Sequence, residues 1–475
     1  MMNHFNFKRR EDNRIFITND FGGYEFLNPD EFQKLASNQV EKGSNLYERL
    51  HKKLFVMEPM EIYSSDVTNN LRQIKNYLFS GTSLHIFVVT NQCNLKCIYC
   101  QAQDHMVEAK GMMSEETGKR AVDIALQAPG HLLTFEFQGG EPLLNFIVIK
   151  SMIEYTEAHK GDKIVEYTLI SNFSLLTDEI ADFLLAHKVN ICTSLDGPEY
   201  VHTRNRLSMN GSNSYRLMQL GLEKMRKRGF QPGAIQTTTR YSLSQAREIV
   251  REYLEMGMQG IFLRPLTPLG FAKSDWEKLG YTTDEFLEFY REAFDEVLRI
   301  NKEGIRFVEQ HAVFFLRKIL LGNSDNYMEL RSPCGATLGQ LAYYYNGDVY
   351  TCDEARMVAE AGDTAFRLGS VFSNDYRQLV SGRTCTATCA ASILETIPGC
   401  CDCVYQPYCG VCPVINYALY GNIFPKQVGG YRCEVYRGIL EFLFRLLDAR
   451  DDETIAILNS WVRDDKIEHI EAQRG

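Results

Sequence analysis

The sequence predicts an α/β protein built around a barrel or partial barrel of parallel strands. Between residues 82 and 266, strand-like and amphipathic helix-like stretches alternate, and six strands can be counted. Six consecutive βα units imply a barrel or partial barrel whose active site lies at the carboxyl ends of the strands. The strand-like stretches are SLHIFVVT, LLTFEFQ, VEYTLIS, NICTSLD, AIQTTTR and GIFLRPL.

The composition limits the class of protein. A chain of 475 residues suggests two or three domains, and it contains no run of eighteen apolar residues that could span a bilayer. The N-terminus MMNHFNFKRREDNR lacks the apolar segment of a secretory signal, so a cytoplasmic location is expected. In that compartment, fourteen cysteines favour metal ligation over disulfides. The net charge of −10 gives no indication of nucleic-acid binding, and no membrane partner is expected.

The segments on either side of the barrel have their own patterns. At the N-terminus, RIFITNDFGGYEFL predicts a hairpin that turns across residues 19–23, followed by two helices. Asn28 is expected to cap the first helix, with Pro29 in its first turn, and Ser114 to cap a helix of the barrel. Ten cysteines lie between residues 334 and 433. The predicted divisions are an N-terminal module (1–80), the barrel (81–310), a cysteine-rich domain (311–445) and a C-terminal helix (446–475).

Three cysteines follow the first barrel strand with the spacing C-x3-C-x2-C. Cys93, Cys97 and Cys100 could hold three corners of a [4Fe–4S] cluster and leave the fourth iron open to a small molecule. The alternative is a zinc knuckle, but zinc sites usually pair two C-x2-4-C motifs to reach four ligands.

The cluster loop, with Tyr99 before its third cysteine, resembles that of radical S-adenosylmethionine (radical SAM) enzymes. About forty residues later, a strand ends in a GGEP segment, which in that family binds the amino end of the cofactor's methionine. Glycines allow close backbone approach, and a carboxylate can pair with an ammonium. The stretch SLDGPEYVHTRNR resembles the family segment in which a serine and a later arginine contact the cofactor carboxylate. The cofactor-binding residues expected are Tyr99, Gln138, Gly139, Gly140, Glu141, Ser171, Asn172, Ser194, Arg206 and Arg264.

The cysteine-rich region resembles the SPASM domain, an auxiliary-cluster module of peptide-modifying radical SAM enzymes. The resemblance implies one [4Fe–4S] cluster held by Cys400, Cys403, Cys409 and Cys433. It implies a second held by Cys334, Cys352 and Cys412, although the x2 spacing before Cys412 departs from the usual x3. The second set lacks one ligand, so that cluster is open to substrate or is completed by Cys385 or Cys389. A pair of structural zinc sites is the alternative for the whole region. Cys192 and Cys401 are not expected to be ligands.

Asp353, directly after Cys352, is the candidate catalytic residue. In sulfatase-maturing relatives, the aspartate at this place is proposed to take a proton from the substrate, and a carboxylate can act as a base. A structural role beside the cluster is the alternative.

The family resemblance implies a partial (β/α)6 TIM-like barrel and a radical SAM peptide maturase. Such an enzyme contains a SAM-binding cluster and two auxiliary clusters, and receives electrons from an external flavodoxin- or ferredoxin-type donor. The N-terminal module resembles a small winged-helix module that recognises leader peptides by strand addition, and the overall layout resembles maturases of His-Xaa-Ser peptide systems. The alternatives are a sulfatase-type (formylglycine-generating) maturase and, from another class, a non-catalytic iron–sulfur electron-transfer scaffold.

Overall fold

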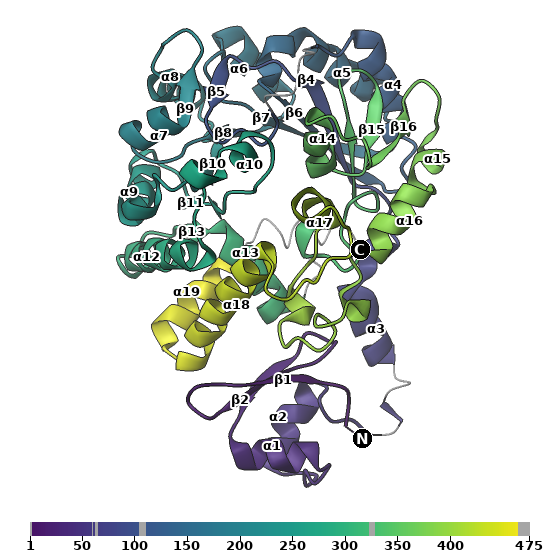
Figure 1. The fold of residues 1–475 in the computed structure, drawn as a ribbon, viewed down its shortest axis with the longest axis vertical. Helices are drawn as coiled ribbons and strands as arrows, with labels where there is room; N and C mark the ends of the chain where they lie inside the picture. Colours follow the sequence, from purple (N-terminus) through teal and green to yellow (C-terminus); the bar gives the residue numbers. More distant parts are fainter. Residues whose placement is uncertain (1, 59, 62–64, 104–110, 323–327, 464–475) are drawn as a thin grey trace.

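The computed structural model describes the whole chain except residues 1, 59, 62–64, 104–110, 323–327 and 464–475. Figure 1 shows the N-terminal module at one end of the long axis and the central sheet with its helices toward the other. Residues 383–462, drawn in light green to yellow, lie between them.

The N-terminal module is a three-stranded antiparallel sheet with two helices. The predicted hairpin joins β2 (Ile15–Thr18) to β3 (Tyr24–Leu27), and β1 (Asn6–Arg9), which was not predicted, pairs with β2. The two expected helices are α1 (Pro29–Ala36) and α2 (Asn45–Lys52). Asn28 caps α1 as predicted, because its side chain accepts from Glu31 N–H while the Glu31 carboxylate accepts from Asn28 N–H.

This module packs tightly on the cysteine-rich region. Phe16 is 2% exposed, and its ring lies 4.5 Å from that of Phe444. Asn6 Nδ2 donates to the carbonyl oxygens of Cys401 (3.0 Å) and Cys403 (3.2 Å), and Thr18 Oγ1 donates to Val404 O (2.7 Å). Helix α3 (Ser65–Ile74) lies in the chain between the module and the first barrel strand, and the module shares the main core.

The central sheet contains all six predicted parallel strands, and strands that are consecutive in the chain are neighbours in it. The last expected strand, GIFLRPL, is split into β11 (Gly260–Ile261), which pairs with β13 (Val308–Glu309), and the sheet strand β12. The six strands are β4 (Leu84–Thr90), β6 (Leu132–Gly139), β7 (Ile164–Ile170), β8 (Asn190–Ser194), β10 (Gly233–Thr237) and β12 (Leu263–Arg264).

Helices connect these strands. The helix predicted after Ser114 is present, and Ser114 Oγ accepts from Thr117 N–H. The connecting helices are α4 (Glu115–Ala125), α5 (Phe146–His159), α6 (Asp178–Ala186), α7 (Glu199–Asn205), α8 (Ser214–Arg226) and α9 (Ala246–Glu255). After β12 come α10 (Gly270–Ser274), α11 (Trp276–Leu279), α12 (Thr283–Lys302) and α13 (Gln310–Leu316).

The sheet continues into the cysteine-rich region. β14 (Gln340–Tyr343) pairs parallel to β4, and β15 (Asp348–Tyr350) and β16 (Arg367–Ser370) follow as antiparallel strands. The result is one nine-stranded mixed sheet that crosses the division expected at residue 310. Closure of the six strands into a partial barrel, and the SPASM and winged-helix assignments, stay predictions.

Short and long helices complete the C-terminal part of the chain. The described part of the helix predicted over residues 446–475 lies in two helices, because α18 runs to Ala449 and Arg450 (φ 55°) turns the chain into α19; residues 464–475 lie outside the described residues. Among the described residues, no helix is long and apolar enough to cross a membrane. The helices are α14 (Asp353–Glu360), α15 (Tyr376–Val380), α16 (Arg383–Ala390), α17 (Pro413–Tyr420), α18 (Tyr431–Ala449) and α19 (Asp452–Val462).

Candidate functional site

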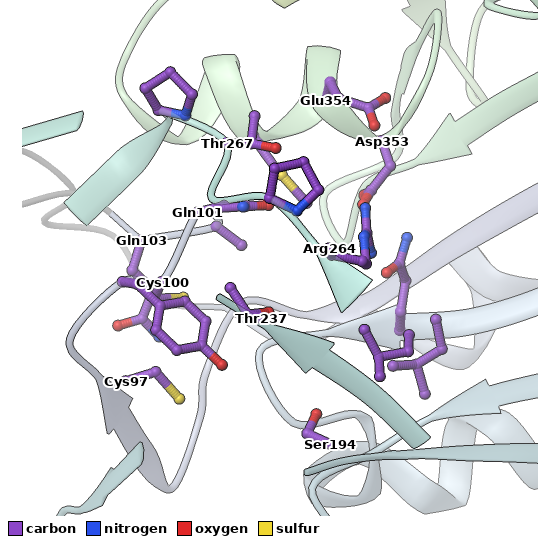
Figure 2. Close-up of a pocket in the computed structure, with 18 of the residues that line it drawn as sticks. Cys97, Cys100, Gln101, Gln103, Ser194, Thr237, Arg264, Thr267, Asp353 and Glu354 are labelled. Atoms are coloured by element: carbon purple, nitrogen blue, oxygen red, sulfur yellow. The ribbon is translucent and has the colours of Figure 1, made fainter. Parts of the chain in front are cut away.

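A cavity of about 280 Å³ lies at the carboxyl ends of the parallel strands. Cys93, Cys97 and Cys100 line one end of it, as the sequence predicted. Figure 2 shows Cys97 and Cys100 on one side of the view and Asp353 and Glu354 on the other. The cavity therefore connects the two regions to which the sequence assigned iron–sulfur clusters.

Backbone contacts fix the loop that carries the three cysteines. Its short strand β5 (Leu95–Cys97) pairs with β9 (Arg206–Ser208), which places Cys97 opposite Arg206. At its far end, Phe271 N–H lies 2.9 Å from both Cys100 O and Gln103 O. The loop is held by main-chain hydrogen bonds on both sides, so its thiols are positioned without any metal.

The two glycines of the GGEP segment are required by the close approach of the strand that precedes Cys93. A Cβ at Gly139, whose φ is +146°, would lie 2.1 Å from Thr90 O, and one at Gly140 would lie 2.1 Å from Gln92 O. Gly140 N–H donates to Thr90 O (2.9 Å), and Glu141 N–H donates to Gln92 O (2.8 Å). The glycines thus attach the end of β6 to the start of the cysteine loop.

Glu141 is fully buried and holds the end of β7. Its carboxylate accepts from Ser171 Oγ (2.7 Å), Asn172 N–H (2.8 Å) and Leu143 N–H (3.1 Å). Burial raises the pKa of Glu141 to about 6, against the opposing effect of these donors. Ser171 and Asn172 line the cavity, whereas Glu141 lies behind them. The geometry therefore gives Glu141 a positioning role, and direct contact with a cofactor ammonium stays a prediction.

Arg206 lines the cavity and is paired with Asp196, a residue to which the sequence assigned no role. The carboxylate of Asp196 is 0% exposed and accepts from Arg206 Nε and Nη2, both at 3.1 Å. It also accepts from Tyr99 Oη (2.9 Å). The aspartate of the SLDG motif could have indicated this pair in the sequence, because an aspartate buried at a strand end needs a cationic partner.

The other expected cofactor-binding residues line the same cavity, and Figure 2 shows Arg264 beside Asp353. Arg264 stands at the end of β12 with its guanidinium 5.4 Å from the Phe262 ring centroid. Asn172 Nδ2 donates to Asn94 Oδ1 (3.0 Å) beside the cysteine loop. The structure brings to this one cavity Tyr99, Gln138, Gly139, Gly140, Ser171, Asn172, Ser194, Arg206 and Arg264.

The opposite wall is acidic. Asp353 lies on the cavity and forms an ion pair with Arg356. Next to it, burial and the carboxylates of Glu329 and Asp353 raise the pKa of Glu354 to about 7. Glu329 itself pairs with Arg432 and accepts from Tyr436 Oη (2.9 Å). Glu329 and Arg432 come from distant parts of the chain, so no sequence pattern indicated that they meet here.

His311 also faces this wall and was not anticipated. It is 2% exposed and lines the cavity, and in the described part of the chain neither ring nitrogen has a hydrogen-bond partner. Its ring lies 5.3 Å from that of Phe315 and 5.5 Å from that of Tyr436. Burial lowers its pKa to about 4, so it is neutral at physiological pH.

The structure describes all of the auxiliary cysteines, and their division into two ligand sets stays a prediction. Cys334, Cys352 and Cys412 are buried in one apolar cluster. In the other set, the thiols of Cys400 and Cys409 are each influenced electrostatically by the remaining members, including Cys403 and Cys433. In the part of the chain that the structure describes, no three His, Cys, Asp or Glu residues are grouped closely enough to hold a single metal ion.

The chemistry of the donor sets fits the group that they are expected to hold, because thiolates are the usual protein ligands of a [4Fe–4S] cluster. Burial raises the pKa of Cys93 to about 12 and that of Cys97 still higher. A thiol binds a metal as the thiolate. A bound metal lowers the free-energy cost of removing the proton from a buried thiol.

Comparisons with known proteins agree with this geometry. The family model described as Radical SAM superfamily matches residues 87–244. This segment contains the cysteine loop, the GGEP glycines and Arg206. The chain carries a radical SAM domain.

Several relatives of this radical SAM protein are enzymes. It is 27% identical over 283 residues to the cysteine-type anaerobic sulfatase-maturating enzyme of Clostridium perfringens, covering 57% of this chain and 74% of the relative. It is 21% identical over 448 residues to the radical SAM cyclopropyl synthase TigE of Paramaledivibacter caminithermalis, covering 90% and 86%. The protein is accordingly an enzyme, and the scaffold alternative is set aside.

Solved structures share the radical SAM α/β fold. The structure of anSMEcpe with bound AdoMet and Kp18Cys peptide has a TM-score of 0.66 at 22% identity, over 80% of this chain and 99% of that one. Streptococcus suis SuiB bound to precursor peptide SuiA has a TM-score of 0.53 at 14% identity, over 88% and 96%. These likenesses establish the fold.

Proposed function

We propose that this radical SAM enzyme is a maturase that oxidatively modifies a side chain or backbone carbon of a ribosomally made peptide. When bound, a [4Fe–4S] cluster and S-adenosylmethionine would supply a 5′-deoxyadenosyl radical that abstracts a hydrogen atom from the peptide. The observation that carries the proposal is the single cavity bounded by Cys93, Cys97 and Cys100 at one end and by Asp353 at the other. Relatives with similar folds are bound to peptides in their solved structures.

The residues at the first end have distinct tasks in this proposal. The backbone of Gly139 and Gly140 and the side chains of Ser171 and Asn172 would bind the cofactor's methionine part. Glu141 would keep Ser171 and Asn172 in place through its three accepted hydrogen bonds. Arg206, fixed along one edge by Asp196, presents positive charge to the same wall.

Leader recognition would use the N-terminal module. Its β1 is an edge strand whose residues Phe7 to Arg9 are exposed, whereas β2 is buried along its length. Arg10 N–H bonds to Arg14 O, so the antiparallel alternation turns the N–H groups of Phe7 and Arg9 toward the open edge. A peptide strand could add there. The narrower prediction is that the enzyme is a maturase of a His-Xaa-Ser peptide system.

A backbone substitution tests strand addition without removing the module. Phe7→Pro deletes an outward N–H, which an edge strand tolerates, whereas Phe7→Ala keeps it. We expect Phe7→Pro to weaken binding of a labelled short peptide encoded beside the gene by at least about tenfold relative to Phe7→Ala. Fluorescence anisotropy measures this. Equal affinities of the two variants would show that the module is a structural extension and does not bind the peptide by strand addition.

Iron content tests the cofactor assignment. Anaerobic reconstitution should yield about twelve irons per chain, from about three [4Fe–4S] clusters, and the Cys93→Ala/Cys97→Ala/Cys100→Ala variant should retain about eight. An external flavodoxin- or ferredoxin-type donor would supply electrons. Stoichiometric zinc with no more than about four irons in the wild type would refute the auxiliary clusters.

A sulfatase-type maturase is the second candidate, because Asp353 stands on the cavity wall where a proton acceptor would be needed. That function predicts oxidation of one Cys or Ser in a sulfatase-derived peptide by the wild type, and its loss in Asp353→Asn. If the sulfatase-derived peptide gives no product and the short peptide encoded beside the gene is modified, the result favours the first candidate.

A further inference from the structure

His311 lines the cavity, although the expected cofactor-binding residues do not include it. Its side chain is buried, and within the described chain neither ring nitrogen has a hydrogen-bond partner. The main chain of Leu263 acts on the ring, at a geometry short of a hydrogen bond. A buried donor or acceptor without a partner destabilises the folded protein, so an unpaired imidazole on a cavity wall points to a ligand.

A buried carboxylate fixes the main chain that carries His311. Glu309 accepts from His311 N–H (3.1 Å) and Ala312 N–H (2.6 Å) at the start of α13. The same carboxylate accepts from Leu263 N–H (3.2 Å) at the start of β12. One side chain therefore joins the beginning of α13 to the strand that ends at Arg264, and this join keeps the histidine at the cavity.

Three aromatic rings hold this imidazole in place. The ring of Phe315 stacks on it at a centroid distance of 5.3 Å and an angle of 17°. The rings of Phe262 and Tyr436 stand nearly perpendicular to it at 5.6 and 5.5 Å, and both residues line the cavity. The hydroxyl group of Tyr436 accepts from Arg432 Nη2 (2.8 Å) and donates to Glu329 (2.9 Å). The packing thus fixes the ring but gives its nitrogen atoms no partner.

The imidazole is neutral, so it offers one N–H donor and one nitrogen acceptor. Burial lowers the pKa of His311 to about 4; the carboxylate of Glu329 opposes this effect, and the guanidinium groups of Arg264 and Arg432 add to it. Glu329 and Arg432 form an ion pair with each other. A neutral ring that can both donate and accept is suited to a neutral amide or hydroxyl group, whereas a buried ion would need an opposite charge.

We propose that His311 is a substrate-binding residue, whose ring hydrogen-bonds to an amide or hydroxyl group of the peptide and so selects the residue that enters the cavity. The rings of Phe262 and Tyr436 would contact the apolar part of the same residue. A purely structural histidine would be expected to have a protein partner, and the described chain provides none. This inference rests on the proposed function, because it takes a peptide as the ligand of the cavity.

The test uses the full chain with its clusters reconstituted anaerobically. His311→Phe keeps an aromatic ring in the stack and removes both nitrogen atoms, whereas His311→Gln and His311→Asn each restore a neutral hydrogen-bonding group. His85→Phe is the matched control, because His85 is also a buried imidazole but does not line the cavity. The probe is the labelled short peptide encoded beside the gene. Fluorescence anisotropy gives its dissociation constant, and mass spectrometry of the product gives kcat and KM.

We expect His311→Phe to bind the peptide about tenfold more weakly and to raise KM more than it lowers kcat, since one hydrogen bond to the peptide is lost. Iron content and cleavage of S-adenosylmethionine without peptide should stay at the wild-type level. The urea midpoint of unfolding should stay the same or rise, because an unpaired buried polar group has been removed. His311→Gln or His311→Asn should recover binding, and His85→Phe should bind the peptide as the wild type does.

An alanine scan of the peptide against the wild type and His311→Phe identifies the group that is bound. A peptide position whose replacement weakens binding to the wild type but not to His311→Phe supplies the partner side chain. If no position behaves in this way and every peptide binds His311→Phe more weakly, the partner is a main-chain amide.

Two results overturn the assignment. The first is a His311→Phe variant that binds and modifies the peptide as the wild type does. The second is a lower unfolding midpoint in His311→Phe with no recovery of binding in His311→Gln or His311→Asn, which would show that the ring is structural. A wild type that neither binds nor modifies the peptide contradicts the proposed function as well as the inference.

Discussion

Two buried carboxylates at opposite ends of the cavity differ in how they are satisfied. Glu141, behind the cofactor end, accepts hydrogen bonds from Ser171 Oγ, Asn172 N–H and Leu143 N–H. Glu354, at the other end, has no hydrogen bond or ion pair with another side chain in the described residues, and the guanidinium of Arg432 acts on it while pairing with Glu329. The comparison distinguishes a carboxylate held in place by hydrogen bonds from one that is not.

The largest effect is expected at Gly140. Alanine there would place a Cβ 2.1 Å from Gln92 O and displace the segment before Cys93. The variant should lose the first cluster and fall from about twelve to about eight irons per chain. Gly382→Ala is the matched control, because a Cβ at Gly382 meets nothing within 4 Å. A full iron complement in Gly140→Ala would show that the first end is less rigid than described.

The buried pair of Asp196 and Arg206 gives the next largest effect. Asp196→Ala leaves a guanidinium buried without its partner, which should lower the free energy of unfolding by about 3–5 kcal/mol. Urea denaturation of the metal-free chain measures it. Asp182→Ala, which breaks an exposed pair with Arg228, should leave the unfolding midpoint unchanged. Similar midpoints for the two variants would contradict the role given to Asp196.

A smaller effect, the pH dependence of stability, tests the role given to Glu141. Burial raises the pKa of Glu141 from 4.5 to about 6, so its contribution to stability is present below pH 4.5 and is lost as the pH rises through about 6. Between pH 5 and 7, the wild type should lose about 1 kcal/mol more stability than Glu141→Gln. At pH 7, Glu141→Gln should also bind S-adenosylmethionine more weakly.

Glu354→Gln serves as the contrasting variant in the same metal-free chain. Because its carboxylate has no hydrogen bond or ion pair with another side chain among the described residues, and burial disfavours its charge, neutralising it should leave the unfolding free energy unchanged or raise it. Destabilisation of Glu354→Gln equal to that of Glu141→Gln would remove the distinction between the two ends of the cavity.

Sequence patterns predicted the cofactor end better than the acidic wall. The strands, the cysteine loop and the glycines of GGEP are local signals, since each depends on residues adjacent in the chain. The meeting of Glu329 with Arg432 depends on tertiary packing, and no local pattern encodes it. A domain boundary was expected at residue 310 because local patterns change there. The pairing of β14 with β4 joins strands more than 250 residues apart, and no local pattern encodes it.

The central claim is that a radical generated at the Cys93, Cys97 and Cys100 end removes a hydrogen atom from a peptide in the cavity. The most direct measurement uses the short peptide encoded beside the gene, prepared fully deuterated, with reduced enzyme and S-adenosylmethionine. Mass spectrometry of the 5′-deoxyadenosine should show one deuterium taken from carbon, together with a peptide changed in mass. Unlabelled 5′-deoxyadenosine accompanied by a modified peptide would contradict the account.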